Sequence, residues 1–172
     1  MPKKGSKYAE STNVTPEESK TAINYILKQW GVRGIQWSEM FDPPAVVLQF
    51  LWSPDGLDQH YMAKMQLALP TDETLTEEAK HKRTGKVLED KLERLKDQRG
   101  WREHRVLHIF LKGAFEAIDN GIITAEQLFL PWLVGRDGRT VGEVVGPRLP
   151  ALMNDTAAAL LPPAQSTASQ ED

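Results

Sequence analysis

Histidines and carboxylates are the first candidates for chemistry in this sequence, because its 172 residues include no cysteine and therefore no thiolate nucleophile or thiolate metal ligand. His104 and His108 stand four residues apart, and on a helix this spacing places both imidazoles on one face, where they could share a metal ion. No third ligand follows from the spacing, so we expect both rings to be solvated or hydrogen-bonded and predict no metal site. His60 and His81 have no identifiable Asp or Ser partner, which leaves no basis for a catalytic triad.

Carboxylates do not form a recognisable catalytic pattern either. A metal-dependent nuclease core would need an acidic residue on its second strand and an acid-x-Lys pair on its third. The third strand that we expect offers Ala63-Lys64 without the acid, and Glu89-Asp90-Lys91 falls on an expected helix. Gly85 lies between basic residues but lacks the strand–loop–helix context of a phosphate-binding loop. We therefore predict that the protein is not an enzyme and that it has no catalytic residue, metal or cofactor.

Charge is distributed unevenly along the chain. The formal net charge is −3, so the whole molecule is not a general polyanion binder, yet residues 80–112 hold eleven basic residues against five acidic ones. Lys and Arg gain affinity for phosphate by releasing counterions, and an exposed Trp101 could stack on a base of a single strand. We therefore predict a nucleic-acid-binding surface on this segment. Its expected residues are Lys91, Arg94, Arg99, Trp101, Arg102, Arg105 and Lys112.

The same charges allow a second interpretation. Alternation of acidic and basic residues, as in 89–97, is typical of any solvated helix, and Trp101 could belong to the core. On this interpretation the protein is a protein–protein interaction module, an inhibitor or an assembly factor, that binds no nucleic acid. The apolar seam of Leu88, Leu92 and Leu95 fits either intrachain packing or self-association, so a homo-oligomer stays open.

The elements that carry this segment follow from hydrophobic periodicity. Thr15 as N-cap, Pro16 and Glu18 mark the start of a helix that ends at Gly31. Period-two alternation then predicts a first and a third strand, and a nearly continuous apolar run rich in β-forming residues predicts a second strand between them, with short turns separating the three. These strands are expected over residues 32–41, 45–52 and 61–69.

The pattern beyond Pro70 is mostly helical. Residues 88–95 predict a charged surface helix, Gly100 allows a break, and residues 106–118 predict a more buried helix. The polar stripe of that second helix consists of Arg105, His108, Lys112, Glu116 and Asp119. Thr124 and Gln127 form another capping box that opens a short helix through Leu133. The order predicts an α+β fold with an N-terminal helix, a three-stranded antiparallel meander and then two to three helices packed on one face.

The chain reads as one domain with loose ends. We expect residues 1–13 to be a disordered N-terminal segment, 14–153 a single α+β domain and 154–172 a disordered C-terminal tail. No apolar run follows the basic N-terminus, and no stretch approaches the roughly 18 apolar residues of a membrane span. A cytoplasmic location in a host cell and no membrane partner are the corresponding predictions.

Two resemblances add a context. The stretch from Trp101 to Glu143, about a quarter of the chain, includes Phe115-Glu116-Ala117-Ile118, Gly121-Ile122 and a C-terminal run from Asp137. It resembles a group of short, uncharacterised proteins of phages and mobile elements. This resemblance implies a genetic context and no chemistry.

The second resemblance is architectural. A helix, a three-stranded meander and a long basic helix, with Gly34-Ile35-Gln36-Trp37-Ser38 at the start of the sheet, are similar to the β-β-β-α core of single-strand annealing proteins. That likeness implies ring-forming, ATP-independent binding of DNA strands along a basic groove. The overall prediction is a non-enzymatic phage or mobile-element accessory protein that binds nucleic acid, with single-stranded DNA favoured, in strand annealing or recombination.

Overall fold

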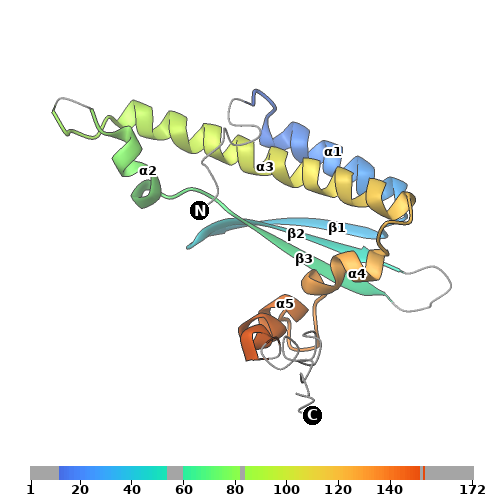
Figure 1. The fold of residues 1–172 in the computed structure, drawn as a ribbon. Helices are drawn as coiled ribbons and strands as arrows, with labels where there is room; N and C mark the ends of the chain where they lie inside the picture. Colours follow the sequence, from blue (N-terminus) through green and yellow to red (C-terminus); the bar gives the residue numbers. More distant parts are fainter. Residues whose placement is uncertain (1–11, 54–59, 82–83, 152, 154–172) are drawn as a thin grey trace, which may run out of the picture.

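A computed structural model describes residues 12–53, 60–81, 84–151 and 153 of the chain. Most of the two segments predicted to be disordered, 1–13 and 154–172, lie outside these ranges, as do Lys82 and Arg83 of the basic segment. The described elements follow the predicted order, with one helix, then three strands, then further helices (Figure 1). The fold class is α+β, as the sequence predicts.

Helix α1 (Pro16–Gln29) begins at the predicted capping box. The Thr15 hydroxyl oxygen accepts a hydrogen bond from the backbone N–H of Glu18, and the Glu18 carboxylate accepts one from the backbone N–H of Thr15 at 2.8 Å. These bonds satisfy backbone donors that have no partner within the first turn of a helix. They also hold the pKa of the Glu18 carboxyl below its usual value, so this carboxylate stays ionised at neutral pH.

The three predicted strands form one antiparallel meander in the order β1-β2-β3. Their bounds are Gly34–Phe41 for β1, Pro44–Trp52 for β2 and Tyr61–Ala68 for β3. Trp37 pairs with Leu48, and Leu48 pairs with Met65, so these three side chains lie in one row on the same face. The alternation of β3 matches this face, whereas β2 is apolar and buried over four consecutive residues.

Among the described residues, four α-helices and two single turns of 3₁₀-helix follow the sheet. They are α2 (Asp72–Ala79), α3 (Glu89–Asp119), α4 (Ala125–Phe129), the 3₁₀ turn Leu130–Trp132, α5 (Val141–Val145) and the 3₁₀ turn Gly146–Arg148. Thr124 and Gln127 form the second predicted capping box, at the start of α4.

The break expected at Gly100 does not occur, and α3 runs through it as one helix of 31 residues. A glycine inside a helix costs only about 1 kcal/mol relative to alanine. Packing on both sides of Gly100 outweighs that cost, because α3 contacts α1 along one half and α2 along the other. The prediction of two separate helices was wrong for this reason.

Helix α2 was not expected from the sequence. It begins with a capping box of two threonines, Thr71 and Thr74, rather than the usual pairing with Glu or Gln. It packs against the first half of α3, and its Leu75 and Ala79 are buried. This is the half of α3 that carries the predicted leucine seam, so α2 supplies intrachain packing there.

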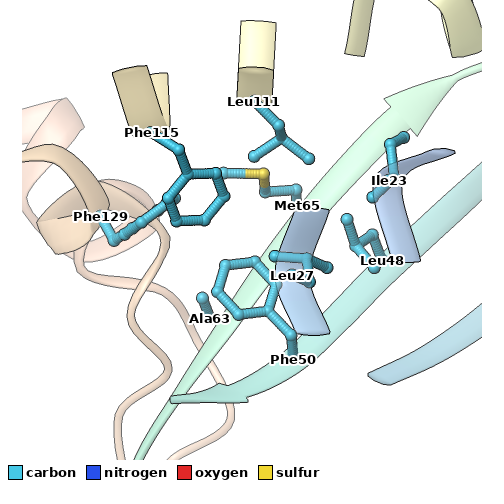
Figure 2. Close-up of a cluster of buried hydrophobic side chains, with 9 residues drawn as sticks. All are labelled: Ile23, Leu27, Leu48, Phe50, Ala63, Met65, Leu111, Phe115 and Phe129. Carbon is cyan, nitrogen blue, oxygen red and sulfur yellow. The ribbon is translucent and has the colours of Figure 1, made fainter. Parts of the chain in front are cut away.

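Helices α1 and α3 lie side by side over one face of the sheet (Figure 1). The core forms between them and β2 and β3 (Figure 2). Its buried residues are Ile23, Leu27, Leu48, Phe50, Ala63, Met65, Leu111, Phe115 and Phe129. Trp30 at the end of α1 stacks on Phe115 near the end of α3, with ring centroids 4.8 Å apart, so the two helices run in the same direction.

Phe129 joins the C-terminal segment to this core. The centroid of its ring lies 5.4 Å from that of Phe50 and 5.6 Å from that of Phe115, and only 2% of the residue is exposed. Immediately afterwards the backbone N–H of Val134 donates to the Met62 carbonyl at 2.8 Å, which attaches the segment to the edge of β3. Phe129 is therefore the fully buried anchor of this segment, and Leu128, Trp132 and Leu133 add partly buried contacts with the same core.

We expect Phe129→Ala to reduce the free energy of unfolding by about 3–5 kcal/mol, because it removes a buried ring and leaves a cavity between three elements. Urea denaturation followed by tryptophan fluorescence measures this change. Leu130→Ala, at the exposed neighbouring position, is the matched control and should change stability by about 0.5 kcal/mol or less. Equal effects of the two substitutions would contradict the placement of Phe129 in the core.

His104 lies buried on the side of α3 that faces α1, with 4% of the residue exposed. Its Nδ1 is 2.8 Å from the Gly100 carbonyl, so Nδ1 carries the proton and donates. Its Nε2 is buried without a hydrogen-bond partner among the described residues. Burial is the main cause that lowers the pKa of this imidazole, so the ring is neutral in the folded protein.

This burial makes stability depend on pH. Since the folded-state pKa of His104 lies below its ordinary value of 6.5, the unfolded chain binds a proton more readily, and stability falls as pH drops below about 6.5. His104→Gln should flatten the dependence of unfolding free energy on pH between pH 7.5 and 5. His108→Gln, at a less buried ring whose pKa is also lowered by burial, should flatten it less. Parallel curves for wild type and His104→Gln would exclude this account.

Candidate nucleic-acid interface

The seven residues predicted to bind nucleic acid all lie on α3, but the helix does not bring them to one side. Arg94, Trp101, Arg105 and Lys112 follow one another at intervals of seven, four and seven residues, which places them along a single stripe. We call these four residues the α3 stripe. The other three predicted residues are Lys91, Arg99 and Arg102, which point in other directions around the helix.

Helix α2 engages two of these three. The Arg99 guanidinium pairs with the Glu78 carboxylate at 2.8 Å, and the Lys91 ammonium donates to the Glu78 backbone carbonyl at 2.5 Å. Lys96, a third cation of the basic segment, pairs with Asp72 at the start of α2. An exposed ion pair contributes only about 0–1 kcal/mol to stability, but each pair lowers the positive charge that the surface offers to phosphate.

The Arg102 side chain is largely buried. It is only 11% exposed, and its guanidinium lies 3.4 Å from the carboxylate of neighbouring Glu103. Two of its nitrogens, Nε and Nη1, are buried without a partner among the described residues. This placement does not present Arg102 to a long polyanion.

The α3 stripe differs in its surroundings from one end to the other. Arg94 is exposed and forms no ion pair with another described residue. Arg105 donates from Nη1 to Nδ1 of His108 at 3.0 Å, which agrees with a neutral His108. Lys112 is exposed but lies among carboxylates described below. The open cationic part of the stripe is therefore its first two-thirds, around Trp101.

Trp101 lines a cleft of about 450 Å³ between α3, the start of α1 and the β1–β2 turn. On the β1–β2 side the cleft is lined by Phe41, which is 86% exposed. Neither ring contacts another described aromatic residue, whereas Trp30, Trp52 and Trp132 all do. Two aromatic faces from distant parts of the chain are thus available in one cleft.

Phe41 was not identified as a functional residue from the sequence. Its position directly before Asp42-Pro43-Pro44 could have indicated it, because a tight turn after a strand displays the preceding side chain. The cleft also holds Lys20, whose ammonium pairs with the Glu39 carboxylate at 3.3 Å. The lining of the cleft holds three carboxylates, of Glu17, Glu39 and Asp97, against the two lysines Lys20 and Lys96, so its distinguishing feature is aromatic rather than cationic.

A second, larger depression lies between α1 and α3. It has a volume of about 770 Å³, and we call it the α1–α3 groove. Its lining comprises Glu17, Glu18, Thr21, Ala22, Tyr25, Ile26, Gln29 and Trp30 of α1, and His108, Lys112, Phe115, Glu116 and Asp119 of α3. Four of the five residues of the polar stripe predicted for the second helix therefore border this groove.

No arrangement for metal or membrane chemistry is present in the described part of the chain. No three metal-ligating side chains gather there, and among the described residues His104 and His108 have no third ligand beside them. None of the described helices is long and apolar enough to cross a membrane. The absence of enzymatic activity stays a prediction.

Comparison with known proteins finds no relative of this chain, so a functional assignment has to use the fold and the two surfaces described above. No family model, no curated protein and no solved structure matches this chain.

Proposed function

We propose that this protein binds single-stranded nucleic acid through Trp101 and Phe41, with Arg94 and Arg105 holding the backbone. The observation that carries the proposal is the pair of unpartnered aromatic rings lining one cleft, next to two cations of the α3 stripe. Aromatic faces stack on bases of any sequence, but only where those bases are unpaired. The resemblances to phage proteins and to annealing proteins favour a role as an accessory protein in strand annealing or recombination.

The arrangement supports a narrower interface than the basic segment alone suggests. Arg94 and Arg105 lie eleven residues apart on α3, about 16 Å along the helix axis, with Trp101 between them. A single strand laid along this line would meet a cation, a ring and a cation in turn. Arg99 would join only if phosphate displaced the Glu78 carboxylate, whereas Lys91 bonds to a neutral backbone carbonyl and keeps its charge.

The salt dependence of binding distinguishes an interface of two cations, Arg94 and Arg105, from one that uses all six predicted cations. For single strands the slope of log K against log salt is about −0.7 per neutralised phosphate. We expect a slope of about −1.4 if Arg94 and Arg105 carry the contact and about −4 if all six predicted cations do. Fluorescence anisotropy of a labelled oligonucleotide, titrated from low to moderate salt, gives this slope.

Removing both cations tests their location. Arg94→Gln with Arg105→Gln should weaken binding and reduce the salt slope by about 1.4. The matched control is Arg136→Gln with Arg148→Gln, which removes two exposed charges from the C-terminal segment and should leave the slope unchanged. An equal loss in both variants would mean that only net charge matters and would overturn the proposed site.

Removing the rings tests stacking. Since base–aromatic stacking contributes about 1–3 kcal/mol per base, Phe41→Ala and Trp101→Ala should each weaken single-strand binding by about five-fold or more, with little effect on duplex binding. Phe41 is the safer test because its exposed ring contributes little to folding. Undiminished binding by both variants would show that the cleft does not hold bases.

The second candidate function is the protein–protein interaction module. It is favoured by the acidic residues of α2, which pair with Arg99 and Lys96 and lower the positive charge of α3. No binding of single- or double-stranded DNA or RNA at micromolar protein and low salt would make this the working function.

A further inference from the structure

We infer that the α1–α3 groove binds a cationic amphipathic helix of a partner protein. This inference is independent of nucleic-acid binding, which uses the cleft around Trp101. It depends on three features of the groove: an apolar floor, carboxylates at both ends and a length that matches a few helical turns.

The floor provides apolar contact area. Ala22, Ile26 and Trp30 follow one another at intervals of four along α1, and Phe115 of α3 stacks on Trp30 at the end of the groove. Tyr25 is 63% exposed at its edge, with its hydroxyl held by Gln29 at 2.9 Å. An amphipathic helix places anchors at i, i+3 or i+4 and i+7 into a groove of this kind.

The rims determine the charge of the partner. Glu17 and Glu18 lie at the start of α1, and Glu116 and Asp119 lie at the end of α3. Because the two helices run in the same direction (Figure 1), the two pairs of carboxylates border opposite ends of the groove. Lys112 is the only Lys or Arg in the lining.

The groups around Lys112 add no further positive charge to the groove, so its lining remains acidic. His108, one turn before it on α3, is held neutral by burial and by the nearby charges of Arg105 and Lys112, which lower its pKa. Glu18 stays ionised through its bonds to Thr15. A phosphate backbone would meet four carboxylates here, so electrostatic repulsion excludes nucleic acid and favours a ligand rich in Lys or Arg.

The length of the groove sets the size of the ligand. Its α1 side runs from Glu17 to Trp30, about 20 Å at 1.5 Å per residue. A partner segment of three to four helical turns fills this length. Such a helix would present Leu-like side chains to Ile26 and Phe115 and place Lys or Arg beside the carboxylates at each end.

The test uses the full chain and two synthetic probes, since the natural partner is unidentified. One is a fluorescent 14-residue helical peptide with Leu along one stripe and Lys elsewhere, and the other replaces every Lys by Glu. We expect the Leu/Lys peptide to bind and the Leu/Glu peptide not to bind, as measured by anisotropy at moderate salt. No binding of the Leu/Lys peptide at about 100 µM would overturn the inference.

Variants separate groove binding from general attraction between opposite charges. Glu116→Gln with Asp119→Gln should weaken binding of the Leu/Lys peptide about three- to tenfold. Glu73→Gln with Glu93→Gln removes two exposed carboxylates that do not line the groove and should have no effect. Equal losses in the two double variants would show non-specific attraction and reject the site.

A third variant blocks the floor directly. Ala22→Arg fills the groove with a long cationic side chain at a helix position that tolerates it, and it should abolish peptide binding. Thermal unfolding verifies that the variant folds, and Tyr25→Ala, at a mostly exposed position, is the substitute if it does not. Undiminished peptide binding by the folded variant would contradict the inference.

Two further measurements distinguish peptide binding in the groove from nucleic-acid binding and from self-association. Arg94→Gln with Arg105→Gln should leave peptide binding intact, so a failure of the nucleic-acid proposal does not affect this one. Light scattering of wild type and Ala22→Arg tests for a second copy of the chain as occupant. A wild-type dimer that Ala22→Arg dissociates would assign the groove to self-association and overturn the inferred partner.

Discussion

The structure depends on covering the single apolar face of a three-stranded sheet. Leu48 and Phe50 of β2 have to be removed from water, and Ile23 of α1 together with Leu111 of α3 completes the cluster that buries them (Figure 2). Apolar burial contributes roughly 25 cal/mol per Å², and so small a sheet is not stable without such a cover. The side-by-side placement of α1 and α3 is the solution to that requirement, and both candidate surfaces follow from it.

The two helices differ in length, and this difference divides α3 into two environments. At 1.5 Å per residue the 31 residues of α3 extend about 46 Å, whereas the 14 residues of α1 extend about 21 Å. Beside α1 the polar stripe of α3 becomes one wall of an acid-rimmed groove. Beyond the start of α1 the helix is accompanied by α2 and leaves Arg94 exposed, and Trp101 lies at the boundary, in the cleft beside the start of α1. One helix therefore presents surfaces of different chemistry along its length.

Much of the fold could be predicted because it depends on residues close together in the chain. The capping boxes at Thr15 and Thr124 involve residues three positions apart. The outer strands follow from an alternation of period two, and the central strand follows from a continuous apolar run. The continuity of α3 through Gly100 could not be predicted in this way. Its local cost is offset by contacts with α1 and α2, whose positions the local pattern does not contain.

The sequence by itself determined the α+β order, the apolar face of the sheet and the basic bias of residues 80–112. The tertiary structure decided which of those charges are available, because Glu78 lies 21 residues from Arg99 in the chain and yet 2.8 Å from it in space. It also brought Phe41 and Trp101 into one cleft. Electrostatic attraction and stacking act over a few ångströms of space, whereas a sequence records only separation along the chain, so local patterns yield elements and only their packing yields a site.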